Sequence, residues 1–231
     1  MTAIGEAGTK RSIAVKWVKN NIVSAIVSGL ASLGVYGVRH ATGALEPGAG
    51  VGEIAFLFVV MIVLSSFSGA AYGVLTGAVL QRVVPLLPVR AWVALNVAMA
   101  IVAGVLTELG LMFLSEPQRG ADDGSLAETL LIGIVFGGVC GIGMGALQAL
   151  VLRRAALGSA IWMLWSGPAF VVVTLMVVLT SRALDTGSGL AAELVSDVVG
   201  VFGFALGSIV MLPALWALRN PLLSRAGQYF H

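Results

Sequence analysis

The chain has 231 residues, of which 58% are hydrophobic and only 10% are charged, and its formal net charge at pH 7 is +2. Soluble domains carry about 25% charged residues, so this composition, with a mean hydropathy of +1.01, excludes a soluble globular protein. The isoelectric point near 9.0 fits an anionic membrane surface rather than nucleic acid, because the basic residues flank apolar segments.

Six apolar segments follow one another along the chain. Each has the roughly 20 residues that an α-helix needs to cross a hydrocarbon core about 30 Å thick. The runs are continuous rather than alternating, which disfavours strands. The first segment is the weakest, because Lys16 and Lys19 shorten its apolar part. We predict an all-α polytopic membrane protein, a single integral membrane domain over residues 1–231, with six transmembrane helices at about 18–38, 54–80, 91–114, 126–151, 159–181 and 194–218.

Prolines mark the predicted breaks in these segments. Pro85 and Pro88 lie in the short connection between the second and third segments. Pro168 and Pro213 lie inside the fifth and sixth segments, where each removes a backbone hydrogen bond. We therefore expect both of these helices to bend.

A pattern of tryptophan and small polar residues recurs in the odd-numbered segments. Each tryptophan is followed four residues later by a small polar residue, in the pairs Trp17 and Asn21, Trp92 and Asn96, and Trp162 and Ser166. This spacing indicates one duplicated hairpin, with repeat units of about 12–82, 88–152 and 158–219. We predict three tandem hairpins in a pseudo-threefold parallel repeat. The tryptophans alone also fit an aromatic belt, in which each helix carries an anchor at the membrane interface.

Glycines spaced by four residues recur in the even-numbered segments. Residues at this spacing share one stripe of a helix and form a groove that lets a neighbouring helix approach closely. In one interpretation the even-numbered helices are the tightly packed centre of the bundle. In the other, three grooves converge around the axis and line a pathway. The helix-packing candidates are Gly69, Gly73, Gly77, Gly137, Gly141, Gly145, Gly203 and Gly207.

The basic residues predict the orientation of the chain. Short loops rich in Lys and Arg remain in the cytoplasm, so both termini are predicted to be cytoplasmic, in a bacterial-type inner membrane. Acidic residues, including Asp197, then fall on the external side. No small-residue cleavage site follows the first segment, so we expect a retained helix rather than a signal peptide. Ten of the 13 basic residues lie on the predicted cytoplasmic side: Lys10, Arg11, Lys16, Lys19, Arg82, Arg90, Arg153, Arg154, Arg219 and Arg225.

Polar residues inside apolar segments are costly in hydrocarbon, so they are the first candidates for function. Five amides and hydroxyls are predicted to lie at one depth near the cytoplasmic ends of the helices. Such a ring can hold a small polar solute by hydrogen bonds. In the alternative interpretation these groups bond across helices and fix their register, each bond contributing about 1 kcal/mol. The five residues are Asn21, Gln81, Asn96, Gln148 and Ser166.

Glu108 is the acidic residue that we place well inside a span. It lies six residues before Leu114, about 9 Å below the external end of its helix at 1.5 Å per residue. A carboxyl group at that depth is a candidate proton or cation site. We expect its countercharge to be Arg182, near the outer end of the fifth segment. The same pair can instead be structural.

Enzyme signatures are missing from the sequence. The two histidines, His40 and His231, lie outside the predicted spans, and there is no H-E-x-x-H motif and no P-loop. The single cysteine, Cys140, lies in the fourth segment, where it fits a small buried hydrophobic residue. We therefore predict no catalytic site, no metal, no cofactor and no nucleic-acid partner.

Two function classes remain. One is a small-solute permease or the solute-binding membrane component of a transporter. The other is an accessory or assembly subunit of a larger membrane complex, whose partners are other membrane subunits as well as the lipid bilayer. In size and six-helix outline the chain resembles the vitamin-binding subunits of energy-coupling-factor transporters, which implies solute binding. We expect the first class.

Overall fold

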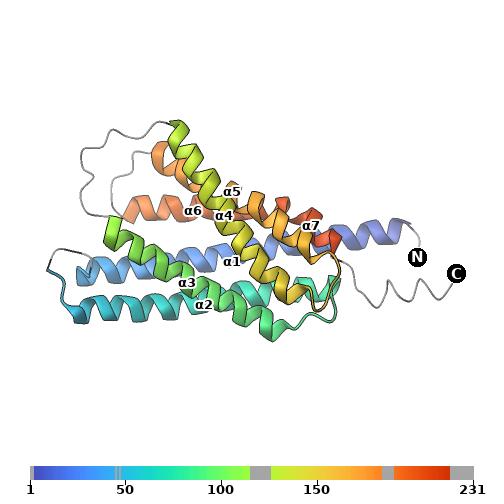
Figure 1. Cartoon of the computed structure of the whole chain (residues 1–231), viewed down its shortest axis with the longest axis horizontal. Helices are drawn as coiled ribbons and strands as arrows, with labels where there is room; N and C mark the ends of the chain where they lie inside the picture. Colours follow the sequence, from blue (N-terminus) through green and yellow to red (C-terminus); the bar gives the residue numbers. More distant parts are fainter. Residues whose placement is uncertain (1–2, 45, 47, 115–125, 184–189, 219–231) are drawn as a thin grey trace.

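The computed structural model describes residues 3–44, 46, 48–114, 126–183 and 190–218, and these residues form a helical bundle (Figure 1). Six helices are long and apolar enough to cross a membrane, so the chain is a multi-pass membrane protein. The helices are α1 (Ala3–Thr42), α2 (Val51–Val83), α3 (Val89–Leu114), α4 (Leu126–Leu152), α5 (Ser159–Ala183), α6 (Leu190–Val210) and the short α7 (Leu212–Ala217).

Several helices extend beyond their apolar segments. α1 continues to Thr42 and stops before Gly43, whose φ of 63° is a left-handed value that glycine adopts without strain. Arg39, one residue beyond the predicted end of the first transmembrane helix at residue 38, is therefore part of α1. The predicted break at Pro213 is confirmed, because α6 ends at Val210 and α7 begins at Leu212. α5 continues through Pro168 as one helix.

The helices are arranged as a ring with one weak seam. α1 packs against α2 and α6, α2 packs against α3, and α5 packs against both α4 and α6. By contrast, α3 and α4 contact each other only slightly although they are neighbours in the chain. In Figure 1, α4 and α5 diverge from α1, α2 and α3 toward the left and converge with them toward the right.

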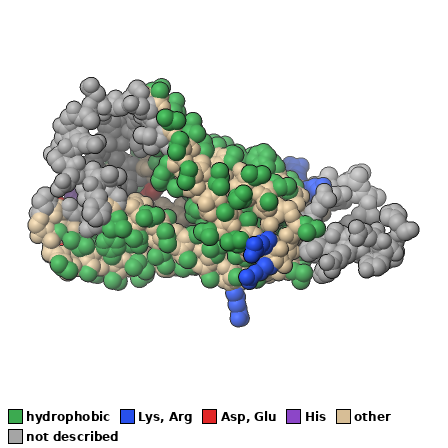
Figure 2. Space-filling view, viewed as in Figure 1, with side chains coloured by type: hydrophobic (Ala, Val, Ile, Leu, Met, Phe, Trp, Pro, Cys, Tyr) green, Lys and Arg blue, Asp and Glu red, His purple; other side chains and the backbone are tan. Residues whose placement is uncertain are grey.

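The outer surface of the bundle is apolar. Leu30 is 65% exposed, and Phe67 and Val139 are each 67% exposed. Hydrophobic side chains cover most of the described surface in Figure 2. A soluble protein avoids such a continuous apolar surface, whereas lipid tails solvate it.

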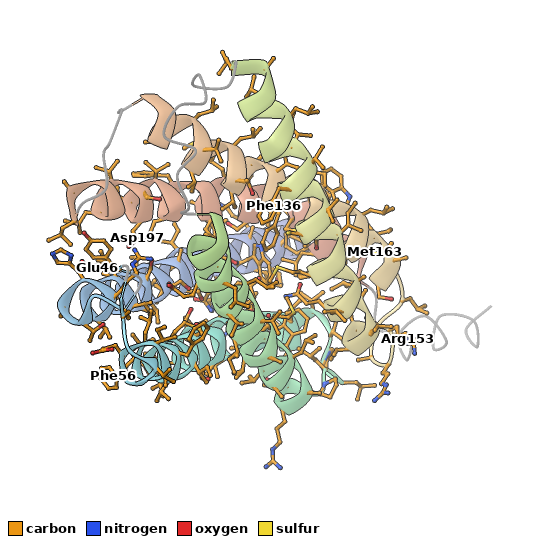
Figure 3. All side chains as sticks on the ribbon, turned by 60° about the vertical axis from the view of Figure 1, so that its left-hand side comes forward. Glu46, Phe56, Phe136, Arg153, Met163 and Asp197 are labelled. Carbon is orange, nitrogen blue, oxygen red and sulfur yellow. The ribbon has the colours of Figure 1, made fainter. Side chains whose placement is uncertain are left out.

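The main core of the bundle lies around Trp17, Trp92 and Trp162, and we call this end of the bundle the tryptophan end. These side chains are 1%, 0% and 1% exposed. The aromatic-belt interpretation was wrong for all three, because a belt tryptophan lies at the lipid surface. The opposite end, which holds Glu46, Glu108 and Asp197, we call the acidic end. Figure 3 shows Glu46 and Asp197 at one side of the bundle and Arg153 at the other.

The glycine ladders lie where helices approach most closely. A Cβ atom on Gly69 would lie 2.6 Å from the Asn96 carbonyl oxygen on α3, and one on Gly141 would lie 2.5 Å from the Ser166 carbonyl oxygen on α5. In the third ladder, a Cβ atom on Gly207 would lie 3.0 Å from the Ala169 carbonyl oxygen, again on α5. The first two ladders thus face the following helix, whereas the third faces the preceding one.

Candidate functional site

A cavity of about 490 Å³ lies inside the bundle, mainly between α1, α2 and α3. It extends from Asn96 to Glu108 on α3, which is about 18 Å along a helix that rises 1.5 Å per residue. α4, α5 and α6 contribute to its far wall through Met144, Phe170 and Phe204. Cavities of this size are in the range of small-molecule binding sites, roughly 300–1,000 Å³.

Serine hydroxyls line one wall of the cavity, and we call it the serine-lined cavity. Ser24, Ser28 and Ser32 are four residues apart on α1, so they share one stripe of that helix. Ser28 Oγ lies 2.6 Å from Ser68 Oγ on α2, and it donates to the Ser24 carbonyl oxygen at 3.0 Å. Ser24 also donates to the Asn20 carbonyl oxygen, at 2.8 Å. A hydroxyl has one proton to donate and accepts through its lone pairs, so these serine oxygens can accept hydrogen bonds from a ligand.

Buried amides form the floor of the cavity. Gln148 Nε2 donates to Asn96 Oδ1 at 3.0 Å, which joins α4 to α3. Trp162 Nε1 donates to Gln148 Oε1 at 2.9 Å, and Asn96 Nδ2 donates to the Trp92 carbonyl oxygen at 2.7 Å. A chain of hydrogen bonds therefore crosses α3, α4 and α5 and holds both amides in fixed orientations.

Three tryptophan rings close the bundle below this floor. The ring centroids of Trp17 and Trp162 are 5.6 Å apart, and those of Trp92 and Trp162 are 6.0 Å apart, both in edge-to-face geometry. Trp17 Nε1 donates to the Ser208 carbonyl oxygen, and Trp92 Nε1 donates to Thr76 Oγ1, each at 3.0 Å. The indole N–H group of each of these three tryptophans thus donates to a residue on an even-numbered helix. Edge-to-face pairs add packing energy beyond the area they bury.

A second, smaller cavity of about 40 Å³ lies at the level of the tryptophans. Tyr72, Gln148, Phe170 and Phe204 line both cavities, so these four side chains form the partition between them. The smaller volume is close to that of one water molecule in the liquid, about 30 Å³.

A charged pair lies at the acidic end of the serine-lined cavity. Arg39 Nη1 on α1 is 3.7 Å from Glu108 Oε2 on α3, and the Arg39 guanidinium also lies 5.3 Å from the centre of the Tyr36 ring. The side chains of Arg39 and Glu108 are 19% and 6% exposed. Arg39 therefore supplies the countercharge that we expected from Arg182, whose side chain lies outside the described residues.

The predicted ring of five polar residues is only partly assembled. Asn96 and Gln148 line the large cavity, and Asn21, Gln148 and Ser166 line the small one. Asn21 and Ser166 each donate to the carbonyl oxygen four residues earlier, at 2.8 Å. Gln81 is exposed and lines neither cavity, because it lies two residues before the end of α2.

Two polar features of the structure were not predicted from the sequence. The first is the serine stripe on α1, whose four-residue spacing is the same as that of the glycine ladders. The second is Asp197, which we counted with the acidic residues of the external side but which lies inside α6, with its Cβ atom 3.4 Å from where a Cβ atom on Gly29 of α1 would be. Glu108 is thus not the single acidic residue inside a span.

No protein-family model, curated protein or solved structure matches the chain. The resemblance in size and helix number to vitamin-binding subunits therefore assigns no role to any residue of this chain. Within the described part of the chain, no three His, Cys, Asp or Glu residues are grouped as metal ligands would be.

Proposed function

We propose that this chain is a non-enzymatic membrane protein that binds a small solute in the serine-lined cavity, either as a permease or as the solute-binding component of a transporter. The observation that carries the proposal is the cavity itself, about 490 Å³ lined on one side by hydroxyls and amides. Protein interiors are close-packed, and voids much larger than a water molecule are few. A space of this size with hydroxyls and amides along one wall is therefore best explained by an occupant.

The proposed orientation has both termini in the cytoplasm of a bacterial-type cell, so that the tryptophan end faces inward. Basic side chains of α1, α2 and α3, with Arg153 and Arg154 just after α4, support it, since Figure 2 shows Lys and Arg toward the tryptophan end of the visible face. Glu46, Glu108 and Asp197 lie toward the other end. Retention of Lys and Arg in the cytoplasm would then put the acidic end of the bundle on the external side.

We also propose that the bundle arose from a hairpin present in three copies. The support is the set of equivalent bonds made by Asn21, Asn96 and Ser166, each to the carbonyl oxygen of the tryptophan four residues earlier. The third glycine ladder departs from threefold symmetry, because it packs on α5 rather than on α1. In this proposal the three copies serve mainly as the structural scaffold of the bundle. The serine-lined cavity does not lie on the pseudo-threefold axis but mainly between α1, α2 and α3.

A second candidate function is an accessory subunit of a larger membrane complex. The weak contact between α3 and α4 favours it, because an open seam between helices can receive a helix of a partner subunit.

The solute-binding proposal is tested by filling the cavity and identifying what co-purifies with the protein. Ala103 lines the cavity on α3, so Ala103→Phe should remove a small molecule that co-purifies with the wild-type chain from native membranes. Ala98 on the same helix is exposed and lines neither cavity, so Ala98→Phe is the matched control and should retain the molecule. Mass spectrometry of both preparations measures the difference. Identical small-molecule profiles would contradict solute binding, and a stoichiometric membrane protein in every preparation would favour the accessory role.

A further inference from the structure

We infer that the ligand of the serine-lined cavity is an uncharged amphiphile that enters from the lipid through the seam between α3 and α4. The inference rests on the proposed function and names the chemical class of the solute and its route. Three observations carry it: the charge balance of the cavity, its two chemically different walls, and the side on which it opens.

The charges that line the cavity cancel. Among the described lining residues, Arg39 is the one basic side chain and Glu108 the one acidic side chain, and Arg39 Nη1 lies 3.7 Å from Glu108 Oε2. A ligand with a net charge would have to be desolvated among hydroxyls, amides and apolar groups, or would have to break this pair. Either process is costly at membrane depth, whereas a neutral ligand avoids both costs.

The two walls of the cavity differ in polarity. Ser24, Ser28 and Ser68 provide hydroxyls on α1 and α2, whereas Met99 on α3 and Phe170 on α5 provide apolar surface. A ligand that matches both walls has hydroxyl or carbonyl groups along one part and a hydrocarbon part along the other. The cavity volume equals that of about 16 water molecules at about 30 Å³ each. The cavity is therefore much larger than a single ion needs, and its size suits an organic molecule.

The cavity opens toward the weak seam of the ring. Ala103 and Thr107 line the cavity from α3 and are nevertheless exposed, so this part of the wall is not covered by α4. The hydrogen bond between Asn96 and Gln148 joins the two helices near the floor. Figure 2 shows a hollow between the two groups of helices, with acidic colour at its bottom. Since the flanking surfaces of α3 and α4 are apolar, the seam faces lipid, and a ligand dissolved in the bilayer can enter there.

Two photoreactive probes of equal chain length test the inference. One is a monoacylglycerol that carries a diazirine in its acyl chain, and the other is the corresponding fatty acid, which carries a carboxylate. Both are added to the full chain in phospholipid vesicles, and labelled peptides are mapped by mass spectrometry. We expect the monoacylglycerol to label cavity-lining peptides of α3 at least about tenfold more than the fatty acid, a preference of the size expected when a buried charge is avoided. Ala103→Phe should abolish this labelling, and Ala98→Phe should not.

A third variant tests the charge argument separately. Glu108→Gln removes the acidic side chain from the cavity lining, so a carboxylate ligand is no longer repelled there and labelling by the fatty acid should rise at least about tenfold relative to the monoacylglycerol. Any one of three results would overturn the inference. The two probes could label the wild-type chain equally, Ala103→Phe could leave the labelling unchanged, or Glu108→Gln could leave the ratio of the two probes unchanged. The monoacylglycerol could fail to label the cavity while the wild-type chain still carries a co-purifying solute that Ala103→Phe removes. In that case the ligand is not an uncharged amphiphile, and the solute-binding function stands. If neither the labelling nor a co-purifying solute is observed, both proposals fail.

Discussion

Replacement of Gly141 by leucine is expected to lower the free energy of unfolding by about 3 kcal/mol or more. A Cβ atom at this position would lie 2.5 Å from the Ser166 carbonyl oxygen, 2.7 Å from Phe170 Cβ and 3.0 Å from Gly167 Cα. Two of these three atoms belong to the α5 backbone, which cannot move aside as a flexible side chain can. In lipid, close backbone approach is the main attraction between helices, so separating α4 from α5 removes that attraction along most of their length.

Gly143 provides the matched control for this substitution. It lies two residues further along α4, is exposed, and has nothing within 4 Å of the position where a Cβ atom would be. Gly143→Leu should therefore leave the stability unchanged within about 0.5 kcal/mol. Unfolding of both variants is measured by denaturant titration in detergent micelles. If Gly141→Leu is as stable as Gly143→Leu, the close contact between α4 and α5 described here is incorrect.

Trp162→Ala is expected to cost about 3 to 5 kcal/mol, the range typical of removing a large aromatic side chain from a packed core. Trp162 lies edge to face with both Trp17 and Trp92, and its indole N–H donates to Gln148. Its removal leaves a void between three helices and leaves the amide oxygen without this donor. Trp162→Phe retains an aromatic ring, although a smaller one, and loses the N–H group, so it should cost less, about 1 to 3 kcal/mol.

Trp165 is the control for the tryptophan cluster. It lies on the same helix within one turn, but it is 36% exposed and faces outward. Trp165→Ala should change the free energy of unfolding by less than about 1 kcal/mol in the same titration. If Trp162→Ala and Trp165→Ala had equal effects, the tryptophan cluster would not be the centre of the packed core.

The apolar spans were predictable from sequence because they depend on local composition. A run of about 20 apolar residues has to become a helix in a bilayer, where every backbone polar group needs an internal partner. The depth of Asn96 and Gln148 was predictable for the same reason, since depth follows from position along a helix. The break at Pro213 also follows from local chemistry, because proline lacks the N–H group that would continue the ladder of hydrogen bonds.

The direction in which side chains face was not predictable from the single sequence. Tryptophan suits both a membrane interface and a packed core, and only the positions of neighbouring helices decide between these. The countercharge of Glu108 depended on where α1 ends: helical structure through Thr42 brings Arg39 to the cavity, whereas apolar composition alone ended the helix at residue 38. The serine stripe was visible as a spacing, but its role depends on the gap between α1, α2 and α3.

The packed core and the proposed binding cavity lie in different parts of this bundle. The glycine contacts on α5 and the tryptophan cluster hold the helices together, and substitutions there should act mainly on stability. The serine-lined cavity lies on the α1–α2–α3 side, where packing is looser and a solute can replace protein contacts. The amide chain through Asn96, Gln148 and Trp162 joins the two regions.

The central claim is that the serine wall borders a cavity that a solute can occupy, and thiol accessibility along α1 tests it most directly. In a Cys140→Ala background, single cysteines replace Ser28, Ser32 or Leu30 in phospholipid vesicles that contain no uncharged amphiphile, and a water-soluble thiol reagent is added. Ser28→Cys and Ser32→Cys should react because the reactive thiolate forms in the hydrated cavity, whereas Leu30→Cys, exposed to lipid, should not. If Ser28→Cys and Ser32→Cys are as unreactive as Leu30→Cys, the bundle is dry at this level and the account is contradicted.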